Sequence, residues 1–373
     1  MINNIHIITL QIPLPLTNGA NFELFYKLKA LHNIGVNIHL HCYKKKQDTP
    51  QHTLLQYCST VNYYNRSNAI SLTKPYIVTS RNSKLLLTNL LANNYPILFD
   101  GLHTTALALH PLLQHQNMLI RVHNVEYLYY KGLINCTNNV LKKIYYLAEA
   151  YLLKKYEKKI ATICKLSTFS YDDKKYFEIE YQAKQITYTP IFYASENITT
   201  NTIVEKYCLY HGNLAVTENE KIALWLCKNV IVKLPAYKFI IAGNNPTFHL
   251  TQTINNYPNC TLQKNLSHNA MQTLIANAHI AILPSINSTG VKLKIINSLY
   301  LGKYLITNNA GAAGITPKQL LTVCNTSCEY IQAITTLYNS NYNNANNSTK
   351  TLILNNHYNN SKNAEVLLKQ IIE

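Results

Sequence analysis

The chain has 373 residues, of which 47% are hydrophobic and only 14% are charged, and this composition excludes a disordered chain, a coiled coil and a collagen-like fibre. At about 150 residues per domain, the length predicts two or three domains. Lysine and arginine number 34 against 17 aspartate and glutamate, so the formal net charge is +17. Such an excess favours an anionic partner: nucleic acid, a phosphate-bearing small molecule or an acidic membrane surface. A compositional drift toward Asn, Ile, Lys and Tyr explains the same excess without any partner.

Cysteine usage and the chain's apolar runs bear on its compartment. The nine cysteines are widely spaced and form no Cys-x-x-Cys pair, so we expect no zinc site and reduced thiols. The N-terminal residues lack the basic stretch of a signal peptide, and no window approaches about 18 consecutive apolar residues. The sequence therefore predicts a cytoplasmic protein without a membrane span.

The first half of the chain opens as strand, helix and strand. Ile5–Leu10 and Val36–Cys42 are β-rich, and Asn21–Asn33 carries apolar residues at helical spacing until Gly35. Such a βαβ unit implies a parallel sheet. The elements expected further along are strands at residues 95–99, 118–122 and 186–189 and helices at residues 104–113 and 141–162.

The second half repeats this alternation. Strands are expected at residues 208–211, 239–242, 279–283 and 304–307, and helices at 218–229, 270–276, 291–301 and 364–372, with loops around a short helix at 339–362. The simplest fold is of the α/β class, with two Rossmann-like doubly wound domains facing across a cleft. We expect an N-terminal domain at 1–195, a C-terminal domain at 196–360 and a closing helix at 361–373.

Ligands of open parallel sheets bind beyond the carboxyl ends of the strands, so the loops at these ends are the candidate sites. In the first half, Asn18 and Gly19 precede a helix, either to let a substrate approach the backbone or only to cap the helix. His103 and His123 follow two strands of one predicted sheet. Each is a candidate catalytic side chain, against the alternative of a structural histidine.

In the second half, Gly212, Asn213 and Gly243 end two strands, where backbone N–H groups either bind phosphate or make plain turns. The most informative segment is Pro284–Leu299, in which Gly290 precedes a helix whose first turn carries Lys292 and Lys294. Cations oppose the dipole at a helix N-terminus, so a bound diphosphate would account for them. A solvated lysine pair is the alternative.

Four segments together resemble the retaining GT-B glycosyltransferases of the family 4 or group 1 type, in particular a bacterial subgroup found in surface-polysaccharide gene sets. These segments are Arg121–Tyr127, Tyr210–Leu214, Ala278–Ser285 and Thr289–Lys294. The resemblance implies a C-terminal domain that binds a nucleotide-sugar donor and an N-terminal domain that helps to bind a saccharide or lipid-linked acceptor. It also implies transfer with retention of configuration and without a metal, and no Asp-x-Asp motif occurs here.

The resemblance assigns roles and exposes one departure. Lys292 and Lys294 would stabilise the leaving diphosphate, and His123 and His103 would orient sugar hydroxyls. The family often places a Glu-x7-Glu pair where this chain has Thr289 and Asn297. Asn297 still offers a neutral amide to the donor ribose, in place of a charge-assisted bond. We therefore expect weaker donor binding, another donor or lost activity, and the alternative function is an inactive relative that binds nucleotide sugar or glycan.

Two surface hypotheses remain. The helix at 141–162 carries six lysines, which fit either a solvated face or peripheral contact with acidic lipid at the inner face of the plasma membrane: Lys142, Lys143, Lys154, Lys155, Lys158 and Lys159. A nucleic-acid-binding protein rests on the net charge alone. The chain has no recognisable zinc finger or helix-turn-helix, so we expect no nucleic-acid partner.

Overall fold

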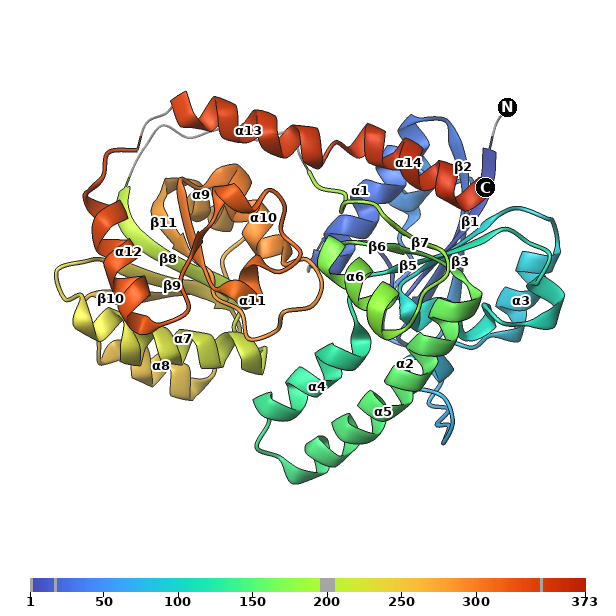
Figure 1. Ribbon diagram of the computed structural model, residues 1–373, viewed down its shortest axis with the longest axis horizontal. Helices are drawn as coiled ribbons and strands as arrows, with labels where there is room; N and C mark the ends of the chain where they lie inside the picture. The colour runs from blue at the N-terminus through green and yellow to red at the C-terminus, as the bar shows by residue number, and fades with distance from the viewer. Residues whose placement is uncertain (1–2, 17–18, 195–204, 343–344) are drawn as a thin grey trace. The chain divides into compact units, whose positions relative to one another are not determined.

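The structure is a computed structural model that describes residues 3–16, 19–194, 205–342 and 345–373 (Figure 1). The chain divides into two compact units. Unit 1 comprises Met1–Ala194, Thr289–Val291 and Tyr358–Glu373, and unit 2 comprises Ser195–Ser288 and Lys292–His357. The short segment Thr289–Val291 and the closing helix thus return to the unit that the N-terminal half builds.

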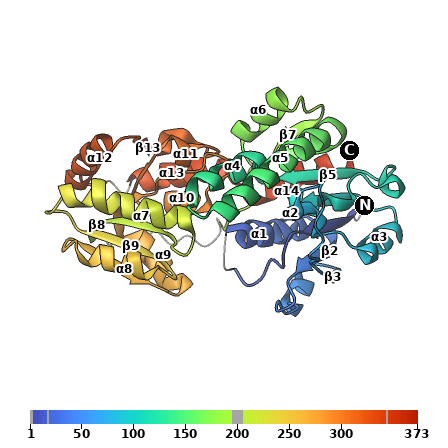
Figure 2. The same cartoon turned by 90° about the horizontal axis from the view of Figure 1, so that it is seen from below.

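Unit 1 contains a seven-stranded sheet, all parallel, in the order β3-β2-β1-β4-β5-β6-β7. Its strands are β1 (Asn3–Thr9), β2 (Val36–Lys44), β3 (Thr60–Asn65), β4 (Ile97–Asp100), β5 (Met118–Val122), β6 (Lys165–Thr168) and β7 (Ile186–Tyr188). Its helices are α1 (Gly19–Asn33), α2 (Tyr76–Thr79), α3 (Lys84–Leu91), α4 (Glu126–Cys136), α5 (Val140–Ile163), α6 (Tyr171–Glu180) and α14 (Asn360–Ile372). Helices α4 and α5 form a hairpin in which they lie side by side (Figures 1 and 2).

Unit 2 contains a six-stranded parallel sheet in the order β10-β9-β8-β11-β12-β13. Its strands are β8 (Glu205–Asn213), β9 (Phe239–Asn244), β10 (Cys260–Lys264), β11 (Ala278–Ile282), β12 (Tyr304–Thr307) and β13 (Thr322–Val323). Its helices are α7 (Thr217–Asn229), α8 (Phe248–Asn255), α9 (His268–Asn277), α10 (Leu293–Leu301), α11 (Asn309–Ala312), α12 (Ser327–Asn339) and α13 (Ala345–His357). Figure 1 shows α7 and α8 on one face of this sheet and α9 and α10 on the other.

Both sheets have the doubly wound strand order, and the predicted α/β class with two parallel sheets is confirmed. The central strands are mostly apolar and fully buried, as expected when helices cover both faces: every residue of β4 and β11 is buried. The order reverses between β1 and β4 in unit 1 and between β8 and β11 in unit 2. Those are the switch points at which such sheets bind ligands beyond the strands' carboxyl ends.

Several predicted elements need correction. The α-helix expected at 104–113 is wrong, because two 3₁₀ helices, Leu102–Leu107 and Pro111–Leu113, occupy this region. The Thr105 hydroxyl donates to the Leu102 carbonyl 2.6 Å away, and Pro111 has no N–H to continue a helix. Helix α10 begins at Leu293, two residues later than expected, so Lys292 is its N-cap residue. Residues 345–357 form a helix of 13 residues where mainly loops were expected.

Candidate functional site

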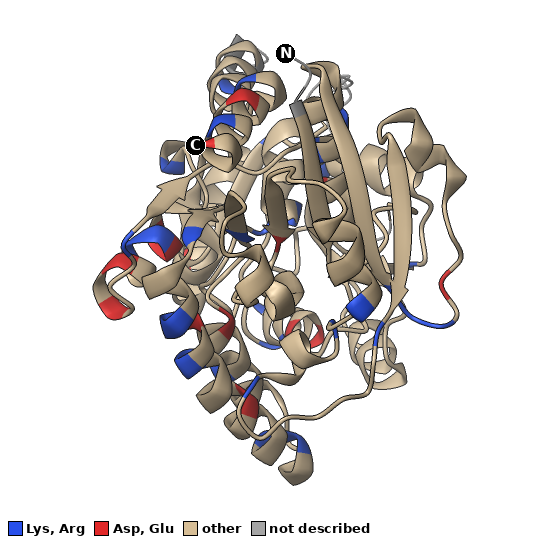
Figure 3. Cartoon of the chain, turned by 90° about the vertical axis from the view of Figure 1, so that its right-hand side faces the viewer, with Lys and Arg blue, Asp and Glu red and all other residues tan. Residues whose placement is uncertain are grey.

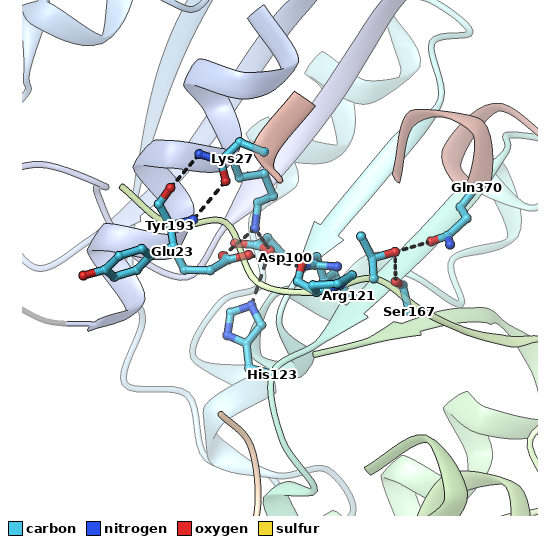
Figure 4. A network of polar contacts seen from close by, with 11 residues as sticks. Glu23, Lys27, Asp100, Arg121, His123, Ser167, Tyr193 and Gln370 are labelled. Atoms are coloured by element: carbon cyan, nitrogen blue, oxygen red, sulfur yellow. Dashed lines mark hydrogen bonds and ion pairs between the residues drawn. The ribbon is translucent and has the colours of Figure 1, made fainter. Parts of the chain in front are cut away.

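The carboxyl edge of the unit 1 sheet carries a buried network of charges (Figure 4). Lys27, on α1, donates through Nζ to Glu23 Oε2 at 2.9 Å and to Asp100 Oδ1 at 2.5 Å. All three side chains are at most 2% exposed. Burial alone would raise the pKa of Asp100, but the charges of Lys27 and His123 outweigh it and lower that pKa. The network therefore holds Asp100 as a carboxylate at the end of β4.

Arg121 and His123 complete this network from β5. Arg121 is fully buried and donates through Nη2 to Glu23 Oε1 at 3.3 Å and to the Pro190 carbonyl at 2.8 Å. Its guanidinium lies 4.4 Å from the centre of the Phe169 ring, which also stacks on His123. His123 Nε2 lies 3.3 Å from Asp100 Oδ1. The predicted catalytic candidate His123 is thus oriented by a carboxylate on one side and an aromatic face on the other.

His103 lies in the 3₁₀ helix that follows β4, close to His123. Its Nδ1 is 3.7 Å from Glu126 Oε1, at the start of α4. Burial and the charge of Arg81 lower the pKa of His103, so its ring is neutral at pH 7. Gly101 adopts φ +94°, and a Cβ there would lie 3.3 Å from His123 Cε1. The glycine before His103 therefore leaves room for the His123 ring.

Two acidic side chains that the sequence analysis did not select lie behind these histidines. Burial and the neighbouring Glu157 raise the pKa of Glu126 to about 8. Burial also raises the pKa of Glu157 to about 8, although its carboxyl accepts from the backbone N–H groups of Glu126 and Tyr127 and from the Tyr181 hydroxyl. Glu157 thereby caps the N-terminus of α4. The position of Glu157 in the lysine-rich α5 did not predict this role.

The predicted donor loop passes through unit 1 at Thr289–Val291. Gly290 donates its N–H to Asp173 Oδ2 at 3.1 Å, and its φ is +66°. A Cβ at this position would lie 2.9 Å from the His123 carbonyl oxygen. Gly290 therefore permits a close backbone approach to His123, the residue after β5.

In unit 2, the glycines expected to bind phosphate lie at the ends of strands. Gly212 on β8 pairs with Gly243 on β9. A Cβ on Gly243 would meet the Gly212 carbonyl oxygen far inside van der Waals contact, so the close approach of the two strands requires glycine at 243. Asn213, the last residue of β8, is exposed and accepts from the Ala215 N–H through Oδ1.

Lys294 lies in the first turn of α10 and reaches toward α7. Its Nζ donates to Asn219 Oδ1 at 3.0 Å and lies 5.2 Å from the centre of the Tyr210 ring. Asn219 in turn donates to the Asn213 carbonyl at 3.0 Å. Burial lowers the pKa of Lys294 to about 8, against the raising effect of Glu218. Lys294 thus lies beside the end of β8, where α7 and α10 both begin, with the neutral Asn219 amide as a hydrogen-bond partner and the Glu218 carboxylate acting at longer range.

Glu218, near the carboxyl edge of the unit 2 sheet, is a site residue that the sequence did not predict. Its Oε1 accepts from Ser285 Oγ at 3.1 Å and from the backbone N–H groups of Ile286 and Asn287, each at 3.0 Å. It therefore fixes the loop after β11. No local pattern marks Glu218, which lies just before a stretch, between Glu220 and Glu329, that contains no acidic residue.

The remaining predicted site residues are placed as follows. Asn18 lies outside the described residues, and Gly19 is the first residue of α1. Asn297 lies in the middle of α10, one residue before Ser298, whose hydroxyl is 2.8 Å from His211 Nε2. Within the described ranges, no group of three or more His, Cys, Asp or Glu residues is arranged to hold a metal ion. No helix in the same ranges has both the length and the apolarity needed to cross a membrane.

Comparison with known proteins identifies the chemistry of unit 2. Residues 205–340 match the model of the family described as "Glycosyl transferases group 1". This segment is a group 1 glycosyltransferase domain. The chain thus contains a glycosyltransferase domain and has the GT-B fold of its structural neighbours, in agreement with the predicted resemblance and enzyme class. Sugar transfer is therefore its general activity.

Individual relatives agree over most of the chain. An uncharacterized 44.6 kDa protein in the cps region of Klebsiella pneumoniae is 27% identical over 329 residues, covering 83% of each chain. The structure of a glycosyltransferase from Rickettsia africae is similar with a TM-score of 0.69 and 14% identity, covering 99% of this chain and 98% of that one. HepE from Anabaena, in complex with UDP and glucose, has a TM-score of 0.56 and 13% identity, covering 100% and 96%.

Proposed function

We propose that this glycosyltransferase moves a sugar from a nucleotide-diphosphate donor to a saccharide or lipid-linked acceptor, with retention of configuration and without a metal ion. The observation that carries this proposal is Lys294, whose ammonium group lies between α7 and α10 with a neutral amide as its hydrogen-bond partner. A diphosphate would supply a direct anionic partner, which the Glu218 carboxylate, held by the loop after β11, does not. The UDP bound to the similar HepE supports a uridine or related nucleotide as the leaving group.

The physics of the site favours an anion at this edge of unit 2. Both α7 and α10 begin beyond the carboxyl ends of strands on either side of the switch point, and helix N-termini attract negative charge. Even with a pKa lowered to about 8, Lys294 is mostly protonated at pH 7. As the bond to the sugar breaks, charge grows on the diphosphate, and a fixed ammonium group stabilises that charge. Lys292, the N-cap residue of α10, would add to this field.

The proposed retention requires no protein nucleophile. Asp100 is bound by Lys27 and His123, so it is a poor nucleophile toward the sugar. In the proposed mechanism the acceptor hydroxyl attacks from the face that the diphosphate leaves, and a diphosphate oxygen takes the hydroxyl proton. His123 would orient sugar hydroxyls, His103 would act beside it as a neutral ring, and Gly19 with Asn18 would approach the acceptor.

The alternative is a relative that binds nucleotide sugar without efficient transfer. It is favoured by Thr289 and Asn297, which stand where the family often has glutamates. Thr289 also groups with unit 1 and not with unit 2. Both candidates predict that the donor binds, but only the active glycosyltransferase predicts efficient turnover.

A thermal-shift screen with UDP, GDP and their sugars tests donor binding, because a ligand of the native state raises the melting temperature. We expect one nucleotide family to raise it, with the shift lost in Lys294→Ala and kept in Lys264→Ala, which removes an exposed lysine of β10. The same donors are then assayed for transfer or hydrolysis, with and without EDTA. Binding without turnover favours the alternative, an EDTA-sensitive rate contradicts metal independence, and no nucleotide shift contradicts both candidates.

We also propose that the enzyme works in the cytoplasm, at the inner face of the plasma membrane, through α5. Five of its lysines are exposed: Lys142, Lys154, Lys155, Lys158 and Lys159. Basic positions recur along the α4–α5 hairpin (Figure 3). The start of α5 also exposes large apolar side chains, among them Leu141 at 77% and Ile144 at 58%. Basic and apolar groups on one helix suit an anionic lipid surface, with about 1 kcal/mol for each lysine.

Sedimentation with vesicles of stated composition tests this attachment. We expect binding to vesicles containing phosphatidylglycerol and little binding to pure phosphatidylcholine. Leu141→Gln/Ile144→Gln should weaken the binding, whereas Leu352→Gln, which changes an exposed leucine of α13, should not. Equal binding of all variants, or none to anionic vesicles, contradicts the proposal.

A further inference from the structure

A chain of hydrogen bonds through two buried histidines joins three strands of unit 1 to α3. His6, on β1, and His41, on β2, are at most 2% exposed. The chain runs from Asn89 of α3 through Tyr64 of β3, His41 and His6 to Asn93, just after α3, with distances of 2.7, 2.8, 2.9 and 2.9 Å. His6 pairs with the first residue of β4, so the chain lies toward the amino end of that strand, whereas the candidate catalytic side chains lie at its carboxyl end.

The direction of the bonds along this chain follows from one fixed donor. The Tyr95 backbone N–H donates to Asn93 Oδ1 at 3.2 Å, which identifies that atom as an acceptor. His6 therefore donates to it through Nε2, and in the neutral ring this leaves Nδ1 as an acceptor. His41 then donates through Nε2 to His6 Nδ1 and accepts through Nδ1 from the Tyr64 hydroxyl. All these bonds are satisfied at once when both imidazole rings are neutral.

A second proton on either ring breaks this arrangement. On His6 the proton would lie on Nδ1 and face the N–H of His41 across 2.9 Å, so that two donors would meet. On His41 it would also lie on Nδ1, where it would take the place of the proton that the Tyr64 hydroxyl donates. A buried donor without an acceptor and a buried charge without a counter-ion both destabilise the folded state.

Among the described residues, no carboxylate is one of the groups that act on His6 or His41. The charges that act on the pair come from the two rings themselves and from His39 of β2, which is also basic. The other titratable rings in contact are Tyr95, 5.6 Å from His6, and Tyr64, 5.8 Å from His41, while α3 and the turn after it contribute the two amides already named. Burial, together with the charge of His39, lowers the pKa of His6 to about 4 and that of His41 to about 3.

Helix α3 depends on such contacts for its stability. It has eight residues, and a helix of that length is not stable alone in water. Its buried side chains are Leu86 and Leu90, and Gln116 Nε2 donates to the carbonyls of Leu90 and Asn93 at 3.1 Å each. The histidine chain adds the polar attachment to β1, β2 and β3. Loss of that attachment therefore favours a local opening of α3 over unfolding of the whole unit.

We propose that the hydrogen-bonded pair His6 and His41 is an acid-sensitive latch, which fastens α3 and residues 92–95 to the sheet of unit 1 while both rings are neutral and releases them when a ring is protonated. The latch involves neither nucleotide nor sugar, so it does not depend on the proposed function. In the released state the histidines regain their ordinary pKa of about 6.5, which is above the folded-state values. The latch is therefore closed above about pH 6.5 and weakens as the pH falls toward 4, by up to about tenfold per pH unit for each histidine.

Amide hydrogen exchange of the full-length protein at pH 7.5 and pH 5.0 tests this latch, with each rate divided by that of an unstructured peptide at the same pH. We expect the protection of α3 to fall at least about tenfold at pH 5.0. Helix α6, which packs on β6 and β7 at the other end of the same sheet, should keep its protection. Equal protection of α3 at the two pH values overturns the proposal. Equal losses in α3 and α6 also overturn it, because they indicate general acid unfolding.

Variants show whether the two histidines cause the loss. His6→Gln/His41→Gln stays neutral at both pH values, so the protection of α3 should then be the same at pH 7.5 and pH 5.0. His6→Gln alone is the milder change, and it should show about half of the parent's loss on a logarithmic scale. His52→Gln, which replaces an exposed histidine of the same unit, is the control and should behave like the parent. The proposal is overturned if either latch variant keeps the full pH dependence of the parent.

Discussion

The carboxyl edges of the two sheets differ in how their buried charges are paired. In unit 1, the ends of β4 and β5 carry Asp100 and Arg121, and α1 supplies Glu23 and Lys27. Each of these buried charges meets an opposite charge within 3.3 Å. In unit 2, the ammonium group of Lys294 meets an amide oxygen at 3.0 Å.

This difference separates structural charges from charges that await a ligand. A buried network that neutralises itself gains little from a further ion, and removing one member leaves another uncompensated. A cation paired with a neutral amide, beside two helix N-termini, gains from an incoming anion. The edge of unit 1 therefore holds and orients His123, whereas the edge of unit 2 is suited to bind phosphate.

The largest expected effect is the loss of stability in Lys27→Met. This change leaves the carboxylates of Glu23 and Asp100 without their shared cation in a fully buried setting. Breaking such a pair costs about 3–5 kcal/mol of unfolding free energy. Urea unfolding followed by circular dichroism measures it. Lys174→Met, which breaks the partly exposed pair with Glu178, is the control and should cost at most about 1 kcal/mol.

The pH dependence of stability tests the acidic pair behind His103. The pKa of Glu126 rises from 4.5 to about 8 in the folded state, so its stabilising contribution is complete below about pH 4.5 and is lost as the pH rises toward 8. Glu126→Gln stays neutral and should remove the Glu126 contribution to this pH dependence, at most about 5 kcal/mol, whereas Glu157 still titrates. Urea midpoints between pH 5 and 9 measure the slope. Glu365→Gln, which changes an exposed glutamate, is the control. If Glu126→Gln leaves the pH dependence of stability unchanged, or if Glu365→Gln changes it equally, the raised pKa of Glu126 is contradicted.

The sequence predicts features that depend on neighbouring residues, but not contacts between residues that are far apart in the chain. Strand and helix patterns are local, so β5 and β12 were predicted to the residue and the α/β class followed from their alternation. The β-rich stretch that forms β3 is polar at several positions and was missed. Lys27 lies 73 residues from Asp100, and Glu218 lies 67 residues from Ser285. No local pattern encodes such pairings, so the networks that fix both edges emerged only in the structure.

A smaller effect is expected for Asn297→Glu, which places in unit 2 the acidic residue that is common in the family. If Asn297 faces the donor ribose, Asn297→Glu replaces a neutral hydrogen bond by a charge-assisted one. That gain is about 1 kcal/mol, or roughly fivefold in the donor's dissociation constant. Calorimetry with the nucleotide found by thermal shift measures it, with Asn297→Gln as the neutral control. Affinity that stays equal or falls in Asn297→Glu places the ribose elsewhere.

The smallest effect on stability should come from Lys294→Met, and it is the sharpest test of the comparison. Burial already disfavours this cation, as its pKa of about 8 shows, and its loss frees only the Asn219 oxygen from one bond. Its side chain packs beside Tyr210, and methionine preserves most of that contact. We therefore expect the unfolding free energy to change by less than about 1 kcal/mol, against several for Lys27→Met. If Lys294→Met unfolds as readily as Lys27→Met, the ammonium group is structural in both units, and the contrast between an edge that holds its own charges and an edge that binds an anion fails.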